Sequence, residues 1–412
     1  VPTSAVNVTI PAAAANMPSI TGSAACKNLT INTGATLTTT SSGTLSIAGT
    51  LTNSGTMTNS GATVFNGTSG QQTFSGVSSF YNLTLNNSSG MLLPAAIAIT
   101  NHLTLTAGTL NANNFNMSVG GNWVNNSGTA AFTGGTAAVT FNGTAAQSIG
   151  GSFVTTFNNL SISNTGNTVS LGINTSVTGN LLVATGTFDL GSYTANRASS
   201  GGTLTVSNGA TLKIGGTNAY PSNYTASSLA AASTVEYAGG NQTVTNQVYG
   251  NLTLSSSGGA TVKTFPGTAL SVAGNLTSTL GAGASLTYTA ASNITVNGVV
   301  SIGASTIFNG GSYAHSVGNN WTNNGTYNGG TGTVTFTGPG STIGGSGTQN
   351  FNNLTVYASL VNIAGVNITV SGNLATTSSG SFTQASAGTF FLTGTGKTIS
   401  GVDTSMQNLD VS

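Results

Sequence analysis

A short pattern that recurs about every 20 residues constrains this chain more than any other feature of its sequence. In each copy, a large apolar residue opens a short segment in which apolar and polar residues alternate. The clearest stretch runs from Val139 to Leu181 and carries the pattern at Phe141, Leu160 and Leu181. A fixed internal period of this kind decides the architecture, because each unit buries its apolar face only against its neighbours.

A ladder of marker residues defines this period along the chain. The markers are Leu29, Leu45, Phe65, Leu83, Leu103, Trp123, Phe141, Leu160, Leu181, Leu204, Tyr237, Leu252, Leu276, Ile294, Trp321, Phe336, Leu354, Leu374, Phe391 and Leu409. The period predicts an all-β fold, a parallel β-helix (β-solenoid) of about 20 coils with about 20 residues in each coil.

The local sequence agrees with short strands joined by tight corners. Apolar and polar residues alternate at 83–85 and 103–105, which turns one side of each strand toward the core. Asn-Gly, Ser-Gly and Gly-Gly pairs between such segments tolerate positive φ. The alternative fold is a series of tandem β-sandwich domains, which also contain short strands and turn signals. We disfavour it, because the distances between successive Asn-Leu pairs, which would mark whole domains, are unequal, whereas the step of about 20 residues between markers persists along the chain.

Two regions differ from the regular repeat. Residues 1–23, which are punctuated by prolines, are predicted to form an N-terminal cap or assembly segment. Residues 24–412 are predicted to form the β-solenoid repeat domain. The longest step between markers, from Leu204 to Tyr237, predicts an inserted loop near residues 215–232.

The composition excludes several classes of function. Only 2% of the residues are charged and the net charge is +1, whereas about a quarter of the residues are charged in an ordinary protein. The chain therefore lacks the basic footprint of a nucleic-acid-binding protein. It has no apolar run of about 18 residues, so we expect no membrane span. The single cysteine, Cys26, excludes an internal disulfide framework, and the stability must come from stacking.

Asn precedes most of the markers, and His102 takes the same place once. If the coils stack in register, these side chains form a column at one corner, in which amides hydrogen-bond along the stack as they do in cross-β assemblies. A neutral column also avoids the repulsion between stacked like charges. The predicted ladder residues are Asn82, His102, Asn122, Asn159, Asn180, Asn251, Asn275, Asn320, Asn353, Asn373 and Asn408.

The residues that could carry chemistry are few. The acids are Asp189, Glu236, Asp403 and Asp410. Glycoside hydrolysis needs paired carboxylates, and a calcium site needs several oxygen ligands, neither of which this spacing predicts. His102 and His315 are far apart, and we expect His315 in a loop or corner and Cys26 in the core of the first coil. The sequence therefore predicts no catalytic residues, no metal site and no cofactor.

Several repeat words resemble those of a known class of proteins. Residues 121–126 (GNWVNN) and 319–324 (NNWTNN) carry one word, and residues 140–144 (TFNGT) and 157–160 (FNNL) carry two others. These words resemble the repeats of large secreted bacterial surface proteins. The resemblance implies a right-handed β-helix similar to that of filamentous haemagglutinin, in a class that is often exported by the type IX route.

We expect an extracellular structural protein at the cell surface, a subunit of a filament that assembles head to tail. Residues 409–412 repeat a word that opens a coil elsewhere, which predicts an edge strand able to pair with residues 1–20 of another copy. The alternative at this edge is that further coils follow. A second class of function is an adhesin that binds surface carbohydrate. Ice binding is a minor variant, suggested by the Thr that follows many markers.

Overall fold

The computed structural model describes residues 2–12, 16–256, 258–362, 366–377, 379–384, 388–401 and 404–412. The chain forms two compact units. Unit 1 comprises Val1–Thr205 and Pro221–Ser228, and unit 2 comprises Val206–Tyr220 and Leu229–Ser412.

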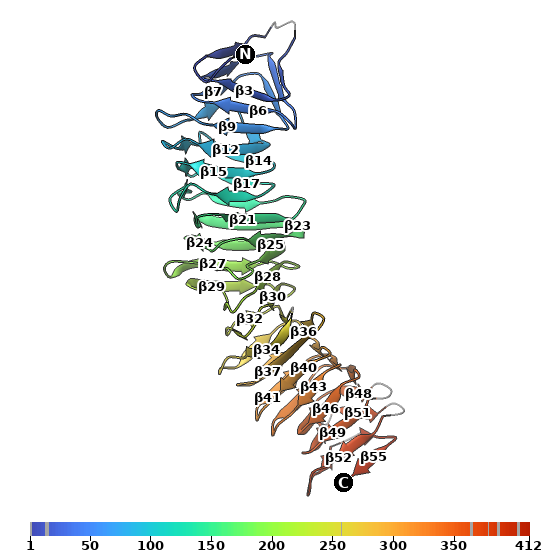
Figure 1. Ribbon diagram of the computed structural model, residues 1–412. Helices are drawn as coiled ribbons and strands as arrows, with labels where there is room; N and C mark the ends of the chain where they lie inside the picture. Colours follow the sequence, from blue (N-terminus) through green and yellow to red (C-terminus); the bar gives the residue numbers. More distant parts are fainter. Residues whose placement is uncertain are drawn as a thin grey trace. The chain divides into compact units, whose positions relative to one another are not determined.

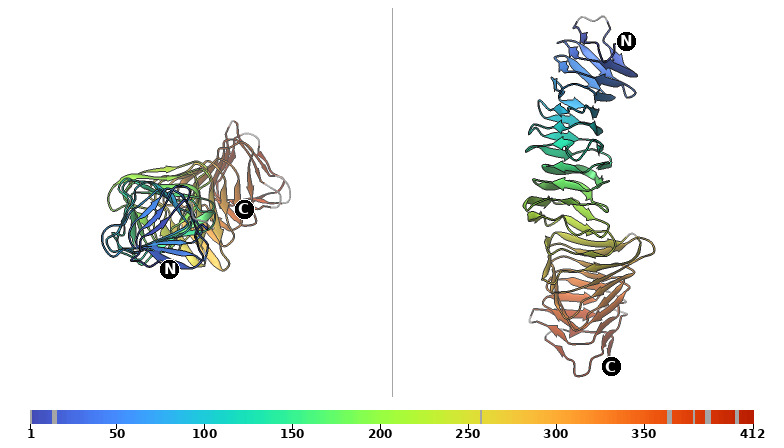
Figure 2. Two further views of the ribbon diagram at one scale, coloured as in Figure 1. Left: turned by 90° about the horizontal axis from the view of Figure 1, so that it is seen from above. Right: turned by 60° about the vertical axis from the view of Figure 1, so that its left-hand side comes forward.

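Both units are β-solenoids, and together they contain about 19 turns. Short strands from successive turns lie beside one another within each unit (Figures 1 and 2). Every strand pair that we describe is parallel, as in β12 (Asn82–Asn86) with β15 (Leu103–Ala107). The predicted parallel β-helix is therefore confirmed, and the alternative of tandem β-sandwiches, whose neighbouring strands are antiparallel, is wrong. No helix among the described residues has the length and hydropathy needed to cross a membrane.

Strand alternation decides which side chains enter the core. In β12, Leu83 and Leu85 are buried whereas Thr84 between them is half-buried. Leu83 is in register with Leu103, and Leu103 is in register with Trp123 of β18 (Trp123–Asn125). The column of large apolar side chains thus continues through three turns of unit 1, and each turn excludes water from the next.

Each regular turn of unit 2 contributes one strand to each of three faces. One turn, for example, supplies β33 (Asn251–Ser256) to the first face, β34 (Gly259–Thr264) to the second and β35 (Leu270–Val272) to the third. The second face consists of nine strands: β31 (Gln242–Thr243), β34, β37 (Ala284–Thr289), β40 (Thr306–Asn309), β43 (Thr326–Asn328), β46 (Thr348–Phe351), β49 (Ile368–Val370), β52 (Phe390–Leu392) and β55 (Leu409–Val411).

The markers occupy the interior, with two exceptions. Phe391 is half-buried and points outward, because its neighbour Phe390 takes the interior position in β52 (Phe390–Leu392). Leu409, in β55 (Leu409–Val411), is 47% exposed. The buried markers do not all lie on one interior face. Leu276 belongs to β36 (Leu276–Leu280) of the first face and Ile294 to β38 (Ile294–Val296) of the third.

The physical reason is that all three strands of a turn point large apolar residues inward. A step between markers that is shorter or longer than one turn therefore leads to an interior position on another face. The threonines that follow the markers are divided in the same way. Thr277 is in register with Ser301 on the first face, and Thr295 is in register with Ser316 on the third.

Two boundaries also differ from the prediction. Within residues 1–23, β1 (Val8–Ile10) pairs with β4 (Leu29–Ile31), and β2 (Ser19–Ile20) pairs with β5 (Thr36–Thr39). The segment predicted as a cap therefore forms strands of the first turn. The loop predicted near 215–232 contains a strand of six residues, β29 (Tyr224–Leu229), because Tyr, Thr and Leu suit an extended backbone.

Candidate functional site

The predicted ladder residues of unit 1 lie one coil apart and are linked by hydrogen bonds. The backbone N–H of His102 donates to Asn82 Oδ1 at 3.1 Å. The N–H of Asn122 then donates to His102 Nδ1 at 2.9 Å. The same bond joins two successive coils elsewhere in unit 1, where the N–H of Asn180 donates to Asn159 Oδ1 at 2.9 Å. His102 thus replaces an asparagine with a ring nitrogen that serves as the same acceptor.

The same type of bond is made by most other predicted ladder residues. The side-chain Oδ1 accepts a backbone N–H one coil later in the pairs Asn122–Ser148, Asn180–Thr203, Asn251–Asn275, Asn275–Val299, Asn320–Thr342, Asn353–Asn373 and Asn373–Thr398. Asn408 differs, since its Nδ2 donates to the carbonyl of Gly388 at 3.3 Å.

These bonds correct the predicted chemistry of the ladder. We expected amides bonded to amides, but at most of these positions the partner in the next coil is the main chain. Asn82 Oδ1 accepts a side-chain amide as well, from Asn101 Nδ2 at 3.0 Å. The corner N–H lies where the strand ladder is interrupted, so that it needs an acceptor, and a short amide supplies one. The side chains are half-buried or exposed rather than buried. The column therefore fastens corners together, and its acceptor atoms are already occupied.

Buried glutamines form a second corner structure that the sequence analysis missed. Gln147 Oε1 accepts the N–H of Gly143 at 2.9 Å, and its Nε2 donates to the carbonyls of Val119 at 2.8 Å and Gly121 at 2.6 Å. Asn164 of the next turn donates to the same Oε1 at 2.9 Å. The signal was present in the sequence, where a Phe-Asn-Gly-Thr word precedes Gln at both 65–72 and 141–147.

In unit 2, Lys263 takes the place that Asn164 has in unit 1, since it donates to the Oε1 of a buried glutamine, Gln242. Its Nζ donates to the carbonyls of Gly239 at 2.8 Å and Gly240 at 2.9 Å and to Gln242 Oε1 at 2.6 Å. The side chain has no exposed surface. Burial lowers the pKa of Lys263 to about 8, and the charge of Glu236 partly opposes this shift. Three acceptors match the three hydrogens of an ammonium group, so the site is satisfied by protein atoms alone.

The other candidate residues do not form a reactive cluster. His315 was expected in a loop or corner, but it lies in β41 (Ala314–Val317) with 5% exposure. Its Nδ1 accepts the N–H of Ile294 at 3.3 Å, and its Nε2 bonds to the Gly310 carbonyl at 2.9 Å. Burial lowers the pKa of His315, and the Gly310 carbonyl partly opposes this. Cys26 is buried, as expected for a core residue.

The acids are distributed along the chain. Asp189, in unit 1, accepts the N–H of Gly191, and Glu236, in unit 2, accepts the hydroxyl of Ser255. Asp410 is exposed in β55, and Asp403 lies outside the described residues. In the described part of the chain, no three His, Cys, Asp or Glu residues are grouped so that they could hold a metal ion.

The outer surface of the second face of unit 2 carries a column of polar side chains in strict register. From turn to turn the column runs through Thr289, Asn309, Asn328, Asn350, Thr369 and Phe391. Its first part is bonded to itself, since Asn309 Nδ2 donates to Thr289 Oγ1 at 3.2 Å and Asn328 Nδ2 donates to Asn309 Oδ1 at 2.9 Å. One amide–amide bond thus joins successive turns here, as the bond from Asn101 to Asn82 does at the predicted corner.

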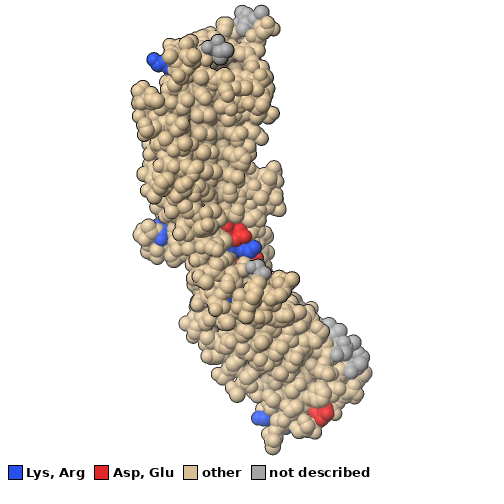
Figure 3. All heavy atoms as spheres, viewed as in Figure 1, with Lys and Arg blue, Asp and Glu red and all other residues tan. Residues whose placement is uncertain are grey.

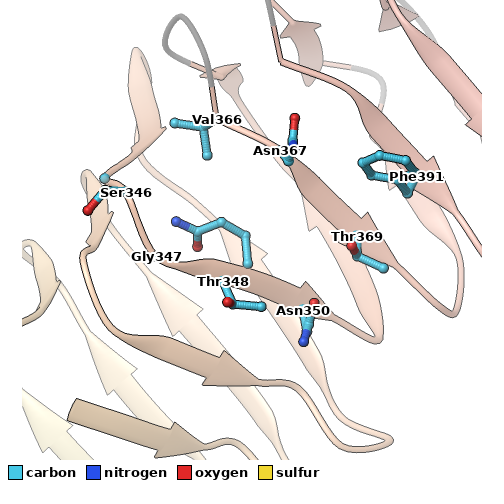
Figure 4. A pocket seen from close by; sticks show the side chains of 10 residues that line it. Ser346, Gly347, Thr348, Asn350, Val366, Asn367, Thr369 and Phe391 are labelled. Carbon is cyan, nitrogen blue, oxygen red and sulfur yellow. The ribbon is translucent and has the colours of Figure 1, made fainter. Parts of the chain in front are cut away.

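Two hollows open on the later part of this column. The first has a volume of about 360 Å³ and is lined by Thr348, Asn350, Thr369 and Phe391 among others. The second, of about 380 Å³, shares Asn350 and Thr369 with the first. Figure 4 shows these side chains projecting from adjacent strands along one surface. The lining residues of both hollows include no Asp, Glu, Lys, Arg or His, and charged residues are sparse over the surface seen in Figure 3.

Comparison of the chain with models of protein families, with curated proteins and with solved structures found no match. The assignment to the repetitive β-solenoids rests on the structure itself.

Proposed function

We propose that the protein is an extracellular structural protein, whose coil stack is the building unit of a cell-surface fibre in which copies join end to end. The observation that carries the proposal is the repeated bonding between turns. Within each unit, parallel strand pairs and corner side chains link one turn to the next, for example at Leu160–Leu181 and Asn159–Asn180. Such a stack bears load through many equivalent bonds and needs no reactive group.

The end-to-end arrangement is supported by apolar surface beside open strand edges in each unit. In unit 1, the first turn has an apolar hollow of about 210 Å³ lined by residues that include Val8, Ile10 and Leu29. In unit 2, Leu409 and Val411 of β55 are 47% and 68% exposed. Apolar side chains beside a strand edge favour pairing with a further strand. The resemblance of the repeat words to secreted bacterial surface proteins supports the extracellular location.

Electron microscopy and sedimentation of the secreted 412-residue protein test this proposal. We expect linear polymers whose length grows with protein concentration. Val411→Lys should shorten them, because it places a charge on the exposed strand. Val248→Lys is the matched control, since Val248 is 67% exposed and lies on the third face rather than on β55. A wild-type protein that stays monomeric at high concentration would refute the proposal.

A further inference from the structure

We propose that unit 2 binds a neutral glycan on its second face, over the turns that carry Asn350, Thr369 and Phe391. The three residues come from β46 (Thr348–Phe351), β49 (Ile368–Val370) and β52, and they are in direct register. The site adjoins the strand proposed to join copies, because β52 pairs with β55, but none of the three residues lies on β55. Glycan binding can therefore be tested without polymer formation.

The first argument concerns hydrogen bonds that the protein leaves unused. Earlier in the column, Asn328 Nδ2 donates to Asn309 Oδ1, and Asn309 Nδ2 donates to Thr289 Oγ1. This series of side-chain hydrogen bonds does not continue to Asn350. Among the described residues, the Asn350 amide and the Thr369 hydroxyl have no protein partner. A half-buried amide in a hollow offers both donors and an acceptor, which is the combination that a sugar hydroxyl requires.

The second argument concerns the ring of Phe391. Its partner in the column is Thr369, and both line the first hollow (Figure 4). An outward aromatic ring beside amides and hydroxyls is typical of a site whose ligand has an apolar face and a polar rim. A pyranose has this form, because its C–H groups lie on one face, where they meet the negative face of an aromatic ring, while its hydroxyls point sideways.

The third argument concerns charge and length. The hollows have no ionisable lining residue, and Asp410 follows Phe391 in the register of β55. The uncharged lining and a carboxylate at that end favour a neutral glycan over uronic acids and sulfated sugars. Turns repeat at about 4.8 Å, so the three residues form a short row that runs across the strands. The three turns therefore fit a short stretch of an extended chain that runs across the strands.

Titration calorimetry with the full chain tests the site, with cellohexaose, xylohexaose and mannohexaose as neutral probes and a galacturonic acid hexamer as the anionic probe. We expect at least one neutral probe to bind and the anionic probe to bind more weakly. Asn350→Ala and Phe391→Leu should each weaken binding at least about tenfold, whereas Phe391→Tyr should retain it. Thr287→Ala is the control, because Thr287 faces outward on β37 (Ala284–Thr289), away from the hollows.

Phe391→Leu keeps an apolar side chain, so thermal melting of the variant separates loss of the ring from loss of the fold. If no neutral probe binds, the site is refuted. Wild-type affinity in a folded Phe391→Leu protein, or tighter binding of the anionic hexamer, would overturn it as well.

Discussion

Lys263 Nζ donates to Gln242 Oε1 at 2.6 Å across the paired strands β31 (Gln242–Thr243) and β34. In unit 1 the corresponding donors to buried glutamines are amides, Asn87 to Gln72 and Asn164 to Gln147. The same corner is thus closed by a neutral group in one unit and by a titratable group in the other. This difference gives the protein a pH dependence that its sparse charge would not suggest.

We predict that Lys263 makes stability rise with pH. Burial lowers its pKa from 10.5 to about 8. Below pH 8 the amine is protonated in both states, and the folded state carries the cost of a buried charge. Between pH 8 and 10.5 the folded state releases the proton while the unfolded state keeps it, so unfolding becomes less favourable. The melting temperature of wild type should therefore rise relative to that of Lys263→Gln as the pH increases from 8 to 10.

The comparison between the two proteins isolates Lys263, because they differ only at this residue. Lys27→Gln is the control for removal of a lysine at an exposed position. Parallel melting curves for wild type and Lys263→Gln over this range would contradict the prediction.

Removing a buried glutamine should be costly. Gln147→Leu leaves the N–H of Gly143 without an acceptor and the carbonyl of Gly121 without a donor. Asn164 keeps its bond to the Ala145 carbonyl, and the Val119 carbonyl keeps the N–H of Asn142. Each unsatisfied buried group costs about 1–3 kcal/mol, so we expect a loss of about 3 kcal/mol or more in the free energy of unfolding. Denaturant titration measures this loss. Gln407→Leu, at an exposed position, should change the free energy of unfolding little.

The corner column can be tested at its histidine. His102→Ala removes the acceptor for the N–H of Asn122 and should cost about 1 kcal/mol, because the corner is partly solvated. His102→Asn restores an acceptor of the type used by Asn82 and should remain close to wild type. Hydrogen exchange at the Asn122 amide reports the bond directly. Equal exchange rates in the Ala and Asn variants would show that the side chain does not hold this corner.

Cys26 should be unreactive in the folded protein. It is 2% exposed, and burial raises the pKa of its thiol from 9.0 to about 11, so little thiolate exists at pH 8. We expect a disulfide reagent such as Ellman's reagent to label it slowly in buffer and rapidly in denaturant. Rapid labelling without denaturant would indicate that the first turn opens readily.

The architecture was readable from the sequence because its signals are local. Alternation at 83–85 and at 103–105 decides which side chains enter the core, and glycine-rich corners decide where each strand stops. The spacing between such segments then requires neighbouring turns to pair. The sequence analysis also placed Cys26 in the core of the first coil, and its thiol is buried.

The tertiary structure decided which side chains point inward and which of the three faces each residue lies on. Phe390 and Phe391 are equally apolar in sequence, and only strand register turns one inward and the other outward. The donation of Lys263 to Gln242 and the column through Asn350, Thr369 and Phe391 join residues about one turn apart. Register between turns is a non-local property, since it depends on how every intervening corner closes. The sequence by itself therefore determined that the chain forms a stack of coils, and the stack determined which side chains meet on its surface.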